Sequence, residues 1–104
     1  MKLITKNEFD AMLHQCSAFT DGGNFAVAQG QDFYTVDAMT LGEKETFVVV
    51  HRRADEPEFM NICDCPDEPF DFVSAWVSDD PVEAALHYSG LIAKGALDRM
   101  LQGL

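Results

Sequence analysis

The eight residues TFVVVHRR, from Thr46 to Arg53, constrain the fold more than any other stretch of this sequence. They include three consecutive valines and no Gly or Pro, a composition that favours a β-strand. Alternation along a strand divides the side chains between two faces, with Phe47, Val49 and His51 on one and Val48, Val50 and Arg52 on the other. We therefore predict a strand here and expect partner strands on either side of it.

Other strand-like runs flank this one. NFAVAQ (24–29) and DFYTVDA (32–38) are separated by Gly30-Gln31 and predict a hairpin. EFMNIC (58–63) is expected to pair back after the turn ADEP, and FDFVSAWV (70–77) is the last predicted strand. In that last strand, alternation would place four side chains on one face: Phe70, Phe72, Ser74 and Trp76. Hairpins rather than crossovers join these runs, so we expect an antiparallel meander of four to five strands.

A helix is predicted near the N-terminus. Thr5 and Glu8 have the spacing of a capping box, and Ile4 and Phe9 that of a hydrophobic staple. An apolar stripe with helical spacing follows: Phe9, Met12, Leu13, Cys16 and Phe19. The prediction is a helix from Thr5 to Phe19, stopped by the glycines of DGG (21–23).

A second helix is predicted after Asp80, a good N-cap, because Pro81 suits the first helical position and Glu83 would complete a capping box. Its apolar stripe has a period of 3.6: Val82, Ala85, Leu86, Ser89, Ile92, Ala93, Ala96, Leu97 and Met100. We expect this helix to pack on one face of the sheet. The fold class is therefore α+β, in a single domain covering residues 1–104.

The charge balance is the unusual feature of the composition. There are 18 acidic and 7 basic residues, a formal net charge of −11, yet eight Phe and 47% hydrophobic residues favour a folded chain over a disordered one. An anionic surface repels nucleic acid and anionic membranes and attracts basic partners. The N-terminus lacks a signal-like apolar core, and three cysteines do not suit a disulfide framework. A cytoplasmic location is therefore expected.

Catalytic and metal sites are not favoured. Cys63 and Cys65 are closer together than the usual zinc-binding pair, and the acids among them would raise a thiol pKa, which opposes redox chemistry. His14 and Cys16 are two residues apart and cannot face each other on a helix. We expect no enzyme activity, metal or cofactor. The alternative is a small metal- or thiol-dependent enzyme that uses four residues: Cys63, Cys65, His51 and His87.

Charge segregation gives the strongest functional signal. The forty residues from Ala54 to Ala93 contain ten acids and no Lys or Arg. The candidate partner-binding residues come from this segment: Asp55, Glu56, Glu58, Asp64, Asp67, Glu68 and Asp71, with Asp79 and Asp80 as second choice. Nearby apolar anchors would be Phe59, Met60, Phe70, Phe72 and Trp76. A solvated face that aids solubility is the simpler explanation for such a run.

Carboxylates in such an array can stand in for nucleic-acid phosphates, so we expect an inhibitor of a basic nucleic-acid-binding protein. In size, acidity and lack of a catalytic constellation, the chain looks like anti-CRISPR and DNA-mimic proteins, or like immunity proteins that neutralise nuclease toxins. No shared motif carries this likeness, so it assigns no residue a role. The chain could be monomeric or homodimeric, and a homodimer seam could use the face bearing Gly90 and Gly95 or an open edge strand.

Overall fold

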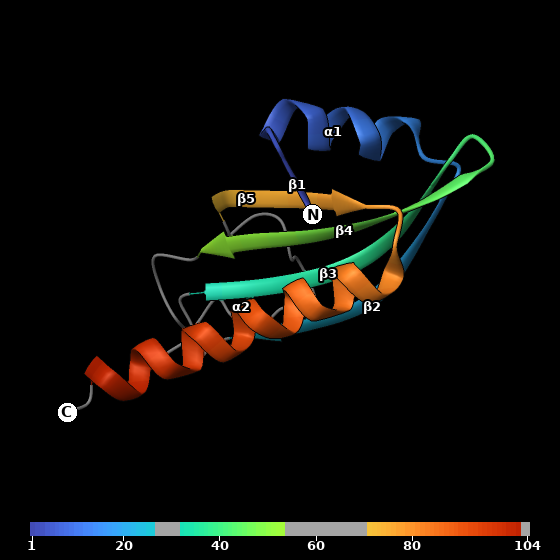
Figure 1. Ribbon diagram of the computed structural model, residues 1–104. Coiled ribbons are helices and arrows are strands. Elements are labelled where there is room, and N and C mark those ends of the chain that lie inside the picture. Colours follow the sequence, from blue (N-terminus) through green and yellow to red (C-terminus); the bar gives the residue numbers. More distant parts are fainter. Residues whose placement is uncertain (27–31, 54–70, 103–104) are drawn as a thin grey trace.

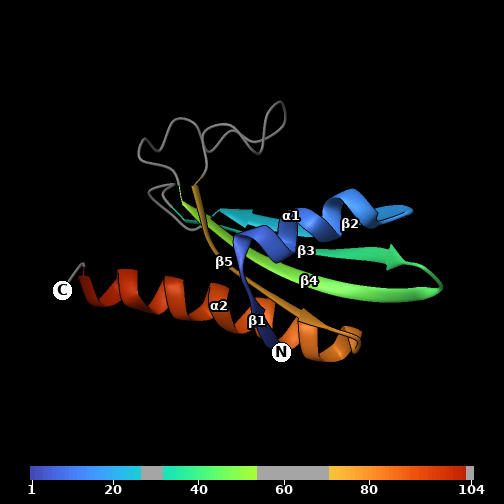
Figure 2. The same ribbon diagram turned by 90° about the horizontal axis from the view of Figure 1, so that it is seen from above.

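A computed structural model describes residues 1–26, 32–53 and 71–102 of the chain (Figure 1). Its elements are β1 (Lys2–Ile4), α1 (Lys6–Gln15), β2 (Ala18–Ala26), β3 (Asp32–Leu41), β4 (Lys44–Arg53), β5 (Asp71–Ser78) and α2 (Pro81–Gln102). The two helices lie on opposite sides of one sheet (Figures 1 and 2). This arrangement confirms the predicted α+β class.

The sheet has five antiparallel strands in the order β1-β5-β4-β3-β2. The predicted strand at Thr46–Arg53 is confirmed as β4, in the centre of the sheet. Strands β2 to β5 form an antiparallel meander, in which β5, rather than the predicted strand at 58–63, pairs with β4. The short strand β1, which the sequence analysis did not predict, adds to the far side of β5. The predicted strand at 58–63 lies outside the described residues.

Helix α1 begins as predicted and ends earlier. The backbone N–H of Glu8 donates to Thr5 Oγ1 over 3.1 Å, and the N–H of Thr5 donates to Glu8 Oε1 over 3.0 Å, which confirms the capping box. The prediction that the helix reaches Phe19 is wrong. Cys16 already has an extended backbone, and Phe19 belongs to β2, where it pairs with Met39 of β3. Cross-strand pairing thus outweighs the helical spacing of the apolar residues there.

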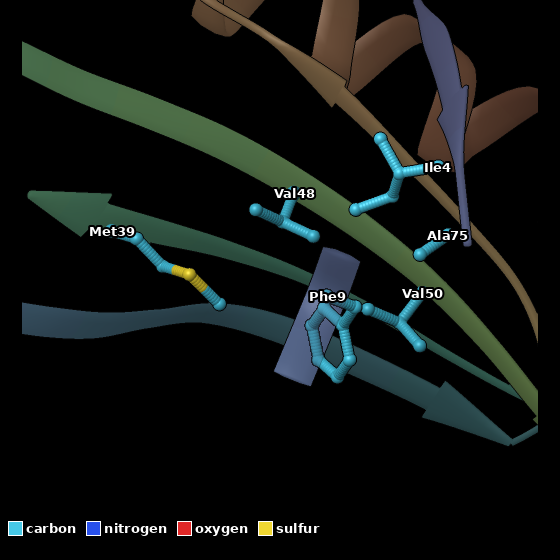
Figure 3. Packing of buried hydrophobic residues seen from close by; sticks show 6 residues of the cluster. All are labelled: Ile4, Phe9, Met39, Val48, Val50 and Ala75. Atoms are coloured by element: carbon cyan, nitrogen blue, oxygen red, sulfur yellow. The ribbon is translucent and has the colours of Figure 1, made fainter. Parts of the chain in front are cut away.

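The core between α1 and the sheet is built around Phe9. Its ring packs among Ile4, Met39, Val48, Val50 and Ala75, all of them buried (Figure 3). Ile4 and Phe9 share this cluster, as a hydrophobic staple requires. Burial at this centre fixes α1 on the sheet, because each fully buried large aliphatic or aromatic side chain contributes about 1.5–3 kcal/mol.

A register shift in β5 divides its aromatic residues between the two faces. The shift lies between the pairs His51–Ser74 and Arg52–Phe72. Phe72 therefore packs on Phe9, with ring centroids 5.8 Å apart, whereas Trp76 packs on His87 of α2 at 4.6 Å. The prediction that Phe72, Ser74 and Trp76 share one face is wrong, because a bulge interrupts the alternation.

Helix α2 covers the other face of the sheet through residues that the predicted stripe mostly omits. Ala84 is buried against the sheet. The half-buried residues of the helix lie on the same side of it as Ala84: His87, Tyr88, Leu91, Ile92 and Gly95. Of the predicted stripe, Ile92 alone is on the sheet side, and its other members are exposed. Both sides of α2 have an apolar repeat, so periodicity could not choose between them. Neither helix of the described chain is long and apolar enough to span a membrane.

Candidate functional site

Three of the nine predicted partner-binding acids lie in the described part of the chain. They are Asp71, Asp79 and Asp80. The remaining six, which are Asp55, Glu56, Glu58, Asp64, Asp67 and Glu68, lie outside the described residues. The two residues that flank this segment, Arg53 and Asp71, pair with each other across β4 and β5. Arg53 and Asp71 therefore lie at adjacent positions at one end of the sheet.

The charged residues at this end of the sheet are balanced. Asp32 Oδ1 lies 2.8 Å from His51 Nε2 and accepts a hydrogen bond from Arg53 Nε over 3.0 Å. Burial acts to raise the pKa of Asp32, but these two partners outweigh it and lower that pKa below its usual value. The ring of His51 also stacks on Tyr34, with centroids 4.6 Å apart. Asp71 is exposed beside this group.

The structure does not bring Asp71 together with the other two described acids. Asp79 and Asp80 follow the opposite end of the eight-residue strand β5, about 25 Å away. Asp79 forms an exposed ion pair with Lys44, its Oδ2 lying 2.6 Å from Nζ. Asp80 Oδ1 accepts from the backbone N–H of Val82 over 2.9 Å, which confirms the predicted N-cap. These two acids serve the fold locally.

The predicted capping box at the start of α2 does not form. The backbone N–H of Asp80 donates to Ser78 Oγ over 3.0 Å, rather than to Glu83. The Glu83 carboxylate instead pairs with the amino group of Met1. This ion pair therefore links the start of α2 to the residue that precedes β1, at the edge of the sheet.

A pair of carboxyl groups that sequence reasoning missed lies on the edge strand β2 and on its neighbour β3. Asp21 of β2 pairs directly with Asp37 of β3. Burial raises the pKa of Asp37 to about 7, helped by the negative charge of Asp21 and by a hydrogen bond with it, while Arg52 acts in the opposite direction. The sequence DGG (21–23) favours a helix stop by composition, so it gives no local signal that Asp21 belongs to a strand.

The residues of the alternative metal or thiol site are not assembled in the described structure. His51 is engaged with Asp32, whereas His87 packs on Trp76. Burial, together with the charge of the N-terminal amino group, lowers the pKa of His87 despite Glu83. Cys63 and Cys65 lie outside the described residues, within which no three His, Cys, Asp or Glu side chains cluster as metal ligands would.

Comparisons with protein-family models, with curated proteins and with solved structures found no match to this chain.

Proposed function

We propose that this protein is a small, acidic, non-enzymatic inhibitor that binds the basic nucleic-acid-binding surface of a larger protein, in the manner of anti-CRISPR or DNA-mimic proteins. The observation that carries the proposal is the charge segregation of the sequence: ten acids and no Lys or Arg between residues 54 and 93. A surface with interspersed acidic and basic side chains would be equally soluble and would avoid the repulsion among like charges.

The physical mechanism is replacement of phosphates by carboxylates. Lys and Arg side chains that hold nucleic acid form charge-assisted hydrogen bonds with either group. Long-range attraction between the acidic segment and a basic channel would speed the encounter, and occupation of the channel would exclude nucleic acid. A cytoplasmic inhibitor would meet such partners directly.

The pairing of the two residues that flank the acidic segment supports this proposal. Arg53 and Asp71 pair across neighbouring strands, so the chain leaves the sheet and returns to it at adjacent positions. Six of the nine candidate acids fall between these two residues. Phe72 and Trp76 pack within the fold, which leaves Phe59, Met60 and Phe70 as the apolar anchors to test.

An immunity protein that neutralises a nuclease toxin would use the same chemistry on a different partner. Affinity capture from a lysate of the source cell, with elution by increasing salt and mass spectrometry of the eluate, separates the two. A nucleic-acid-guided complex favours the first function and a toxin nuclease the second. In both cases we expect affinity to fall steeply as salt rises, because exposed charges are screened.

Two variants with equal net charge test the site once the partner is known. One carries Asp55→Asn, Glu56→Gln and Glu58→Gln, and the control carries Asp10→Asn, Glu43→Gln and Glu45→Gln. We expect the first to lower the association rate about tenfold and the control to change it little, because local rather than total charge guides docking. If neutralising all seven first-choice acids leaves the affinity unchanged, the proposed function is wrong.

A further inference from the structure

Helix α2 presents a second apolar face to solvent, along the side that points away from the sheet. Ala84, His87, Leu91 and Gly95 follow the spacing of the sheet-facing side. The opposite side carries five large apolar residues that are 53–70% exposed: Val82, Leu86, Leu97, Met100 and Leu101. The helix runs along the outside of the molecule, with the sheet on one side of it (Figure 2). Monomeric proteins rarely expose so continuous an apolar strip.

This strip is electrically neutral in a strongly acidic chain. Between Glu83 and Lys94 the sequence contains no Asp, Glu, Lys or Arg. The whole helix has two acids, Glu83 and Asp98, and two bases, Lys94 and Arg99, so its formal charge is zero while that of the chain is −11. A basic partner gains no charge complementarity on this face, and a second copy of the chain meets no repulsion there.

The exposed residues are also arranged symmetrically along the helix. Val82 and Leu101 are equally distant from the midpoint between Leu91 and Ile92, and so are Leu86 and Leu97. Around that midpoint the exposed residues are small: Ser89, Gly90 and Ala93. A Cβ at Gly90 would meet no atom within 4 Å, so this part of the face is open to the close approach of another helix. A two-fold interface requires this kind of self-complementary patch.

The size of the strip suits a modest dimer. The twenty residues from Val82 to Leu101 span about 30 Å, and half the surface of a helix of this length measures about 500 Å². Two copies would bury about 1,000 Å² in total, the lower limit for a specific protein interface. Its apolar composition resembles that of the core of a homodimer interface.

The open edges of the sheet are poorer candidates for self-association. Strand β1 has three residues, and the edge strand β2 has a register shift between Asp21 and Gly23. Short edges and bulges both hinder the addition of a further strand. The face of α2 that bears Gly90 is therefore the better candidate for self-association. Gly95 lies on the sheet side of the helix.

We propose that α2 forms a homodimer with α2 of a second copy, packed antiparallel about a two-fold axis near Leu91 and Ile92. Leu86 of each copy then faces Leu97 of the other, and Val82 faces Leu101. This interface is independent of the acidic segment and of the function proposed above. It gives the assembly two copies of that segment.

Sedimentation equilibrium of the full chain tests the proposal. We expect a monomer–dimer equilibrium whose dissociation constant rises at least about tenfold in Leu86→Lys and in Leu97→Glu, because each buries an unpaired charge. Leu13→Glu, on the exposed side of α1, is the control and should leave the dimer intact. Circular dichroism and thermal unfolding of the dilute proteins verify that each variant is folded. A wild-type chain that stays monomeric at millimolar concentration overturns the proposal.

A mixing experiment tests the antiparallel pairing. Leu86→Lys and Leu97→Glu are each expected to be monomeric alone and to form a heterodimer when mixed, because Lys and Glu then face each other across the interface. In a parallel dimer, residue 86 would face residue 86, and mixing would restore nothing. Recovery of the dimer on mixing supports the proposed geometry, and failure to recover it contradicts that geometry.

Discussion

Asp37 of β3 lies directly opposite Asp21 of β2, so the two side chains lie on the same face of neighbouring strands. Asp37 is 8% exposed, so its charge would be poorly solvated as well as repelled by its neighbour. Burial first, and then Asp21, raise the pKa of Asp37 to about 7. Near neutral pH, this pair of strands therefore contains a carboxyl group that is half protonated, and the stability of the fold depends on that proton.

Asp37→Asn should remove a pH dependence from the stability of the protein. The folded state holds the Asp37 proton up to a pKa of about 7, and the unfolded state releases it near the ordinary carboxyl pKa of 3.8. Stability from this group is therefore complete below about pH 4 and is lost as pH rises to about 7. We expect the variant to gain about 2–4 kcal/mol relative to wild type between pH 4 and pH 8, measured by urea unfolding.

Asp32→Asn is the control with the opposite sign. His51 and Arg53 lower the pKa of Asp32 below its ordinary value of 3.8, so the contribution of its charge is present above that value and is lost on acidification. The variant should be less stable at pH 7 by under about 1 kcal/mol, because the group is partly exposed. An Asp37→Asn curve parallel to that of wild type would contradict the raised pKa.

The sequence predicted the strands more reliably than their pairing. The capping box at Thr5 and the strand propensity of β4 are local patterns, and both predictions are confirmed. Strand β1 and the first half of β2 were missed, because three-residue edge strands and glycine-containing strands acquire their structure from neighbours rather than from propensity. The shift between Ser74 and Phe72 was equally invisible, since a bulge changes the alternation without changing composition.

The candidate site was predictable only in its charge. Counting acids found the segment from 54 to 93, but not that Asp79 pairs with Lys44 or that the predicted N-cap Asp80 follows the opposite end of β5 from Asp71. The pairing of Asp21 with Asp37 depends on strand register, which no local pattern in DGG reveals.

Ala84→Leu and Ala93→Leu form a matched pair that tests which side of α2 meets the sheet. Ala84 is 1% exposed against the sheet, so a larger side chain should cost about 1–3 kcal/mol through overpacking. Ala93 lies on the outward side and should tolerate Leu within about 0.5 kcal/mol. Chemical unfolding of dilute protein measures both. If Ala93→Leu were the more destabilising change, the helix would face the other way, as the sequence stripe predicted.

Gly22→Ala and Gly90→Ala should change stability in opposite directions. A Cβ at Gly22 would lie 2.7 Å from the backbone carbonyl oxygen of Val36, so the edge strand would have to move away from β3. We expect a loss of about 1–3 kcal/mol, because the clash involves backbone rather than a flexible side chain. Gly90 lies within α2 and has open space around it, so Ala should add about 0.5–1 kcal/mol through helix propensity.

Both glycine variants are best compared by urea unfolding well below the concentration at which copies associate, since association would add its own contribution. Hydrogen exchange of the β2 and β3 amides locates the effect of Gly22→Ala, which should weaken protection there before it does so in β4. Equal stabilisation by the two substitutions would show that β2 does not approach Val36 this closely. That result would also contradict the register shift between Asp21 and Gly23, and with it the placement of Asp21 opposite Asp37.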